Sequence, residues 1–188
     1  MFSAHINPSL GMTMGLTSGV DLNNQALQLE RQGDLHGAER VHLQAIQVKE
    51  AGLGTDHSTT AVSYNGLGEL YLKMDRLDKA EEYLNKALRI RSHSGPKADL
   101  AVTRDNLGRL HEMRGDMQAA QDIRLQGASD NNIACGNYAC ANLSNKLSDL
   151  SRCAVCKSIY YCSKRCQTAD WKRHKKFCRR VDGVATKA

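Results

Sequence analysis

The chain has 188 residues, of which 41% are hydrophobic, 5% aromatic and 24% charged. This composition is typical of one or two small globular units, and it excludes collagen, low-complexity fibres and extensive disorder. Its apolar runs are short, and its first residues carry Pro8 without a basic start, so we expect neither a membrane span nor a secretory signal. We therefore expect an intracellular protein of the cytoplasm, the nucleus or both.

The formal net charge of +6 is distributed unevenly along the chain. Residues 1–151 carry 15 Lys/Arg and 18 Asp/Glu, whereas residues 152–180 carry 10 Lys/Arg and a single acidic residue, Asp170. All seven cysteines lie between Cys135 and Cys178. The positive excess and the thiols therefore belong to the same C-terminal segment, and the chain is expected to contain two modules.

Three segments in the first module are similar to one another, and each places a small residue after a turn. These small residues are Ala38, Ala80 and Ala120, so the repeat spacing is 42 and then 40 residues. Around the middle copy, apolar residues recur at i, i+3, i+4 and i+7, which is typical of one face of a helix. Gly68 and Gly108 interrupt such faces at a cost of ~1 kcal/mol, so we expect close helix crossings there.

These patterns predict six helices, at about 20–32, 35–51, 57–74, 77–92, 97–114 and 116–127. The helix-turn-helix unit resembles the tetratricopeptide repeat (TPR), and its long period is similar to the kinesin-light-chain variety; the resemblance covers residues 21–128. It implies an all-α TPR helical repeat array of about three repeats over residues 20–128, after a flexible N-terminus at 1–19. Stacked repeats expose a concave peptide-binding face, although a solvated helical spacer would show the same apolar stripes.

The resemblance also bears on the kind of peptide that the repeats could bind. Repeats that hold the C-terminal carboxylate of chaperones use a clamp of Lys, Asn and Arg side chains. The matching positions here are Asn23, Leu27, Gly66, Val102 and Asn106. We therefore expect no clamp of that type.

Eight candidate metal ligands form four close pairs in the second module: Cys135 and Cys140, Cys153 and Cys156, Cys162 and Cys166, and His174 and Cys178. Two donors separated by two to four residues can bind one ion from a single turn of chain, and zinc takes four such donors in a tetrahedron. An odd number of thiols also argues against a closed set of disulfides. We therefore expect two structural zinc ions with no open position for catalysis. The spacing alone also permits a sequential arrangement, in which each zinc ion is bound by two ligand pairs that follow one another in the chain.

The string YYCSKRCQTADWKRHKKFC at residues 160–178 resembles the MYND zinc finger. The family pattern is matched at Tyr161, Cys162, Ser163, Cys166, Gln167, Trp171, His174, Lys175 and Cys178. The sequence departs from it at the first pair, where four residues rather than two separate the cysteines.

The MYND resemblance implies an interleaved ligand arrangement. It assigns one zinc ion to Cys135, Cys140, Cys162 and Cys166, and the other to Cys153, Cys156, His174 and Cys178. It further implies that Gln167 and Trp171 bind short proline-rich peptides of the PxLxP kind beside a hairpin strand. A lone tryptophan in a small module can also pack against the zinc core, so packing is the alternative role for Trp171.

The finger is expected at residues 135–178, between a linker at 129–134 and a flexible tail at 179–188. It should contain a hairpin between Cys153 and Cys162, with a short strand at 159–161 and a helix capped by Ser163. So small a module has little core, and zinc binding of ~10 to 16 kcal/mol per site would supply most of its folding free energy. We therefore expect a chelator to unfold residues 135–178 and to spare the repeats.

These features together indicate a zinc-binding adaptor whose repeats and finger each dock a peptide segment of a partner protein, with transcriptional regulation as one setting. No cofactor motif is present, and we expect no enzymatic activity. The alternative is a DNA-associated transcriptional regulator that contacts nucleic acid through the basic finger. Seven thiolates and two dications lower the charge of residues 135–180 from +9 to about +6, and no helix has base-reading spacing. We therefore expect protein partners rather than nucleic acid or membrane.

Overall fold

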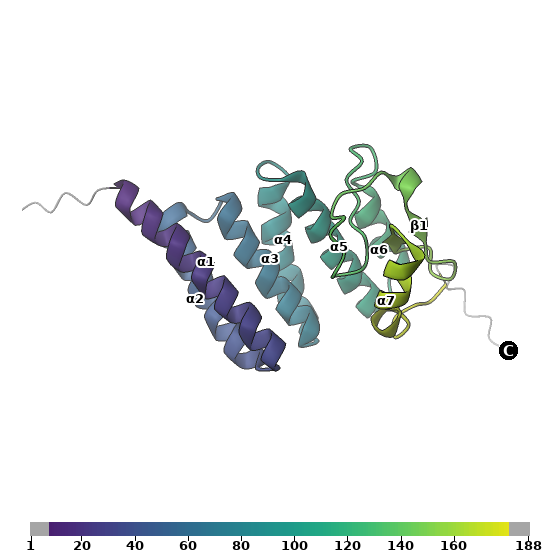
Figure 1. The fold of residues 1–188 in the computed structure, drawn as a ribbon, viewed down its shortest axis with the longest axis horizontal. Coiled ribbons are helices and arrows are strands. Elements are labelled where there is room, and N and C mark those ends of the chain that lie inside the picture. Colours follow the sequence, from purple (N-terminus) through teal and green to yellow (C-terminus); the bar gives the residue numbers. More distant parts are fainter. Residues whose placement is uncertain (1–7, 181–188) are drawn as a thin grey trace, which may run out of the picture. The chain divides into compact units, whose positions relative to one another are not determined.

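The computed structural model describes residues 8–180, which contain seven α-helices and one short β-hairpin (Figure 1). The chain divides into two compact units, residues 1–94 and residues 95–188. Within the described residues, no helix combines the length and the apolar character that crossing a bilayer requires.

The first unit consists of two helical hairpins. Its helices are α1 (Pro8–Gln32), α2 (Leu35–Leu53), α3 (Ser58–Lys73) and α4 (Leu77–Arg91). α1 packs along α2, α3 packs along α4, and α2 contacts α3. Small and branched side chains fill the space between these helices with no exposed surface, among them Ala38, Ala80 and Leu84.

The turns inside the hairpins explain the spacing of the sequence repeat. Gly33, Asp75 and Gly115 all adopt positive φ, between 57° and 85°, two residues before the next helix begins. Glycine adopts this conformation without steric cost, and aspartate tolerates it better than most residues. Asp34 and Asp116 then cap the following helices by accepting hydrogen bonds from the backbone N–H groups of Gly37 and Ala119.

The expected close crossing at Gly68 is present. A β-carbon at this position would lie 2.7 Å from Cγ of Leu84 on α4, which is closer than carbon atoms approach in proteins. The absence of a side chain at Gly68 therefore allows α3 and α4 to pack directly against each other.

The predicted helices agree with the structure within two residues at every end except one. α1 begins at Pro8 rather than near residue 20, so residues 8–19 are helical where we expected a flexible N-terminus. Proline is tolerated in the first turn of a helix, because its missing N–H would have no partner there. The rest of the expected N-terminus, and residues 181–188 of the expected tail, lie outside the described residues.

The second unit contains a third helical hairpin and the cysteine-rich segment. The hairpin consists of α5 (Lys97–Arg114) and α6 (Met117–Leu125). The chain continues through a 3₁₀ turn at Leu147–Asp149 into β1 (Ser151–Arg152), β2 (Tyr160–Tyr161) and α7 (Lys164–His174). β1 and β2 pair in antiparallel register, Ser151 with Tyr161 and Arg152 with Tyr160. Three helical hairpins followed by a strand hairpin and a helix confirm the predicted fold class.

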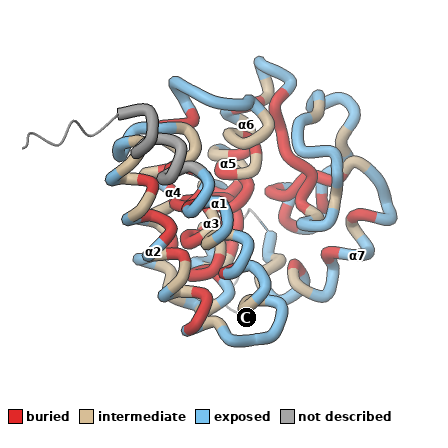
Figure 2. Tube along the Cα trace, turned by 60° about the vertical axis from the view of Figure 1, so that its left-hand side comes forward, coloured by how far each residue is buried: buried red, intermediate tan, exposed pale blue. Residues whose placement is uncertain are grey.

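The cysteine-rich segment shares its core with the third helical hairpin. Met117 of α6 lies in one buried cluster with Ile159, Tyr161 and the buried cysteines. The stretch at 129–134, where we expected a linker, contains the buried residues Asn132 and Ile133, and Ile133 forms an isolated β-bridge with Asn145. The structure therefore groups α5 and α6 with the finger, which the apolar periodicity of the repeats did not reveal. Burial extends along much of α5 (Figure 2).

Candidate metal centre

The eight predicted ligands gather into two clusters of four. The first cluster contains Cys135, Cys140, Cys162 and Cys166, and the second contains Cys153, Cys156, His174 and Cys178. Within each cluster, all candidate ligand atoms lie within 4.8 Å of one another. The structure thus brings together the interleaved sets that the MYND resemblance implies, and it does not bring together the sequential ones.

Short backbone interactions position the first cluster. The N–H of Gly136 donates to the carbonyl oxygen of Tyr160 at 2.7 Å, which holds the loop that carries Cys135 beside β2. Ser163 follows Cys162 and caps α7, because its hydroxyl accepts a hydrogen bond from the N–H of Cys166 at 3.2 Å. The strand end and the first turn of α7 therefore present two thiols to the loop.

The second cluster is built by a tight turn and by the end of α7. The N–H of Cys153 donates to the carbonyl of Ile159 at 3.0 Å, and the N–H of Lys157 donates back to Cys153 at 2.9 Å, with Lys157 at positive φ. This turn presents Cys153 and Cys156 on the same side. The N–H of Cys178 donates to the carbonyl of His174 at 2.9 Å, which continues α7 by one turn to the last ligand.

The distances between the ligand atoms fit tetrahedral zinc sites. In the first cluster, the sulfur of Cys162 lies 3.5 Å from that of Cys140 and 3.6 Å from that of Cys166. In the second, the sulfurs of Cys153 and Cys178 are 3.7 Å apart. Zn–S bonds of ~2.3 Å in a tetrahedron place two sulfurs ~3.8 Å apart, whereas a disulfide needs ~2.05 Å. All seven cysteines are free thiols, and the donor sets fit two structural ions.

Each cluster contains one thiol that is stabilised as a thiolate by its neighbours. Burial alone would raise the pKa of Cys156, but hydrogen bonds with His174 and Ser158 lower this pKa to about 6. Hydrogen bonds from Asn137 and Ser163 likewise lower the pKa of Cys166 to about 6. Because the thiolate is the metal-binding form, both clusters offer an anionic sulfur near neutral pH.

The two residues that the resemblance assigns to peptide binding lie side by side on α7. Gln167 and Trp171 line an open hollow of about 260 Å³ with Lys164 and Thr168. Trp171 is 44% exposed, and its ring centroid lies 6.0 Å from that of His174. The core of the finger is instead formed by Ile159, Tyr161 and the ligands, so an exposed tryptophan is compatible with a docking role.

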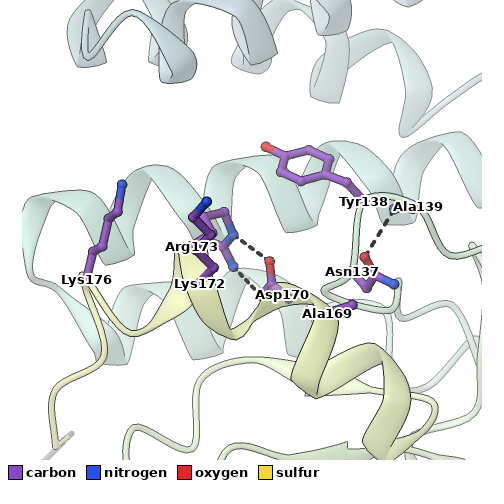
Figure 3. A pocket seen from close by; sticks show the side chains of 8 residues that line it. All are labelled: Asn137, Tyr138, Ala139, Ala169, Asp170, Lys172, Arg173 and Lys176. Carbon is purple, nitrogen blue, oxygen red and sulfur yellow. Dashed lines mark hydrogen bonds and ion pairs between the residues drawn. The ribbon is translucent and has the colours of Figure 1, made fainter.

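A second hollow, of about 390 Å³, lies between α7 and the loop that carries Asn137, Tyr138 and Ala139 (Figure 3). Its basic side chains are Lys172, Arg173 and Lys176, but Arg173 forms an ion pair with Asp170 through two hydrogen bonds of 2.7 Å, so the carboxylate offsets its charge. Tyr138 is 45% exposed. Tyr138 is not among the residues predicted from the sequence, although its position as an aromatic residue between Cys135 and Cys140 was an available signal.

A third hollow, of about 270 Å³, lies in the first unit between α1, α2 and α3. Three exposed apolar side chains line it, Val20, Leu27 and Val62, each between 42% and 44% exposed. Lys49 is buried beneath them, and its ammonium group donates to Ser63 Oγ at 2.9 Å and to the carbonyl of Thr59 at 3.3 Å. Burial lowers the pKa of Lys49 to about 8. Lys49 was not predictable from the sequence, because a single lysine in an amphipathic helix has no distinguishing pattern.

The comparisons with known proteins identify both kinds of module. The tetratricopeptide repeat family matches residues 21–93, and the MYND finger family matches residues 134–178. Among solved structures, the crystal structure of BtubC (BKLC) from P. vanneervenii is similar with a TM-score of 0.55 and 27% identity, covering 60% of this chain and 48% of that chain.

Curated relatives match over shorter stretches. SET domain and MYND-type zinc finger protein 6 of Schizosaccharomyces pombe is 48% identical over 40 residues, 21% of this chain and 8% of that protein. Egl nine homolog 1 of Homo sapiens is 44% identical over 42 residues, 22% of this chain and 10% of that protein. Zinc finger MYND domain-containing protein 10 homolog of Drosophila melanogaster is 36% identical over 62 residues, 33% of this chain and 12% of that protein.

The chain thus spans only 8% to 12% of the length of these relatives. Together with the two ligand clusters, the family matches establish its organisation. The chain carries tetratricopeptide repeats and a MYND-type zinc finger, two non-catalytic domain types that mediate protein interactions.

Proposed function

We propose that this protein is a non-catalytic adaptor, in which a finger held by two zinc ions docks a proline-rich peptide and the repeats dock a segment of a second partner. Cys₄ and Cys₃His donor sets with closed coordination are those of structural zinc sites. Reduced thiols of this kind fit the cytoplasm or the nucleus, where transcriptional regulators are among the partners available to an adaptor.

The exposed position of Trp171 carries this proposal for the finger. α7 contributes Cys166 to the first cluster and His174 to the second, so two bound ions would fix both ends of the helix. Between these ends, Trp171 and Gln167 offer a flat apolar surface next to an amide, and proline-rich segments dock on aromatic surfaces of this kind. A rigid helix keeps this surface in place before the peptide arrives, which reduces the entropic cost of binding.

The repeats offer a different surface. The hollow of the first unit combines three exposed apolar side chains with the ammonium group of Lys49, whose two hydrogen-bond acceptors are neutral oxygens. A buried cation without a carboxylate partner is costly, and an incoming carboxylate would relieve that cost. The chemistry of the hollow therefore favours a peptide that carries apolar side chains and one acidic group.

Trp171 provides a direct test of the finger, since it is the one tryptophan of the chain. We expect its fluorescence to change when the zinc-loaded protein is titrated with a synthetic PxLxP peptide and to stay constant with a peptide that has alanine in place of both prolines. Calorimetry should show that Trp171→Ala weakens binding, whereas Tyr138→Ala, at the other hollow of the finger, does not. Equal affinity of wild type and Trp171→Ala for the PxLxP peptide would refute the proposal.

A further inference from the structure

Glu112 near the end of α5 is one of the most deeply buried charged residues of the second unit. Its side chain has no exposed surface. Oε1 lies 2.7 Å from Nη1 of Arg124, and Oε2 lies 3.3 Å from Nη1 of Arg173. Oε2 also lies 3.4 Å from Nδ1 of His174. A carboxylate from the helical hairpin thus reaches a candidate metal ligand of the finger.

The two ring nitrogens of His174 face different groups. Nε2 lies 3.4 Å from the sulfur of Cys156 and so points into the second ligand cluster. Nδ1 is buried and makes no hydrogen bond within the described residues, and the carboxylate oxygen Oε2 of Glu112 lies at ion-pair distance from it, 3.4 Å. Metal-binding histidines commonly donate their second N–H to a carboxylate, which fixes the tautomer and the orientation of the ring.

The position of Glu112 is itself fixed by both helices of the third hairpin. Arg124 on α6 donates to Glu112 and also to Oδ1 of Asp105 at 2.8 Å. Gly108 leaves room for this arginine, since a β-carbon at Gly108 would lie 2.6 Å from the guanidinium carbon. Arg173, which precedes His174 in the chain, approaches Glu112 from the finger. The carboxylate is therefore held from two sides, while none of these contacts involves a ligand of the first cluster.

We propose that Glu112 is a positioning residue for the second metal site, so that the third helical hairpin completes the outer shell of one of the two zinc ions. This proposal rests on the proposed zinc binding of the finger and adds a role for a residue of the repeats. Glu112 orients His174 toward the ion, and zinc affinity of the second site depends on it. The first site, with four cysteine ligands, does not.

The two sites act as internal controls for each other in a single experiment. In protein substituted with ¹¹³Cd, the Cys₄ and Cys₃His sites should give separate NMR lines, because their donor sets differ. We expect Glu112→Gln to shift or broaden the Cys₃His line alone. In a competition with a chromophoric chelator, the same variant should lose one zinc ion about 10- to 100-fold more readily than wild type and retain the other.

Asp122→Asn is the control. Asp122 is an exposed carboxylate of α6 in the same unit, and its side chain accepts a hydrogen bond from Gln118 at 2.8 Å. We expect this variant, which removes the same charge, to leave the zinc affinity of both sites unchanged. If Glu112→Gln does not fold, Glu112→Asp retracts the carboxylate by one methylene and should show the same selective weakening.

The contrary results distinguish a failure of the positioning role of Glu112 from a failure of the proposed zinc binding. Equal weakening of both sites by the Glu112 variants, or no weakening in a folded variant, would overturn the positioning role. Fewer than two zinc ions bound by the wild-type protein in native mass spectrometry would overturn the proposed zinc function instead.

Discussion

Arg124 donates a hydrogen bond from Nη1 to the carbonyl oxygen of Ser158 at 2.8 Å, and this contact joins the third helical hairpin to the turn between Cys156 and Ile159. The same guanidinium group pairs with Asp105 and Glu112 on α5. Arg109, also on α5, donates to the carbonyl of Gly136 at 2.8 Å, next to Cys135. Both ligand clusters are therefore attached to α5 and α6 by buried arginines.

These contacts change which residues we expect to unfold when zinc is removed. From the sequence we expected a chelator to unfold only residues 135–178, but Arg109, Arg124 and Glu112 would each lose a partner on the finger when the finger unfolds. Hydrogen bonds to charged groups contribute about 1.5 to 3 kcal/mol each, and unfolding of the finger would also expose Met117 of the shared core, a loss that a two-helix hairpin cannot offset. We expect the loss of zinc to expose the amides of α5 and α6 together with the finger.

Hydrogen exchange followed by mass spectrometry measures this effect. After addition of a zinc chelator, peptides from residues 97–125 should lose protection at the same rate as peptides from residues 151–174. Peptides from α2 and α3 in the first unit serve as the internal control and should keep their protection. Retained protection of α5 in the metal-free protein would mean that the hairpin folds without the finger.

Gly68→Ala should destabilise the first unit although alanine is the better helix former. The substitution gains ~1 kcal/mol of helix propensity, but its β-carbon would lie 2.7 Å from Cγ of the fully buried Leu84. Overpacking of a tight core costs about 1 to 3 kcal/mol, so we expect a net loss of stability in urea unfolding. Asn85→Ala, at an exposed position next to Leu84, is the control and should not destabilise the protein.

Sequence periodicity and spacing predicted the helices and the candidate ligands, because both depend on local patterns. Apolar residues at a helical period form the helices around Ala80 and Leu84, and short ligand pairs such as Cys153 and Cys156 need only one turn of chain. The attachment of the finger to α5 was not predictable in this way. It depends on buried charges such as Glu112, and in a sequence such residues look like the solvated face of a helix.

The stability of the first unit should rise between pH 8 and pH 10 because of Lys49. Burial lowers the pKa of its ammonium group from 10.5 to about 8 in the folded protein. Below pH 8, Lys49 is charged in both the folded and the unfolded state. Between pH 8 and the unfolded pKa, the unfolded chain binds a proton that the folded chain does not, so the free energy of unfolding increases by up to ~1.4 kcal/mol per pH unit.

Lys49→Met isolates this effect from other titrating groups. The variant has no ammonium group to bury, so we expect its urea midpoint to exceed that of the wild type at pH 7. The difference between the two midpoints should shrink as the pH is raised to 9.5. A difference that is independent of pH would show that the charge of Lys49 contributes nothing to the stability of the fold.

The hollow of the first unit should bind an acidic apolar peptide through its rim and through Lys49. A suitable probe is a fluorescein-labelled peptide with three leucines and one aspartate, compared with the same peptide carrying asparagine. Replacing Leu27 by Asp removes one apolar contact and places a negative charge near the incoming carboxylate of the peptide. A loss of about 1.4 kcal/mol of binding free energy corresponds to a tenfold weaker complex. We expect Leu27→Asp to weaken binding by about tenfold or more in fluorescence polarisation.

Leu143→Asp is the matched control for this measurement, because Leu143 is similarly exposed, at 41%, but belongs to the second unit. It should leave the affinity for the peptide unchanged. Lys49→Met should abolish the preference for aspartate over asparagine while retaining part of the apolar contribution, since the rim of Val20, Leu27 and Val62 remains. If Leu143→Asp weakened binding as much as Leu27→Asp, the peptide would be responding to net charge rather than to the hollow, and the role of the repeats would have to be sought on another face.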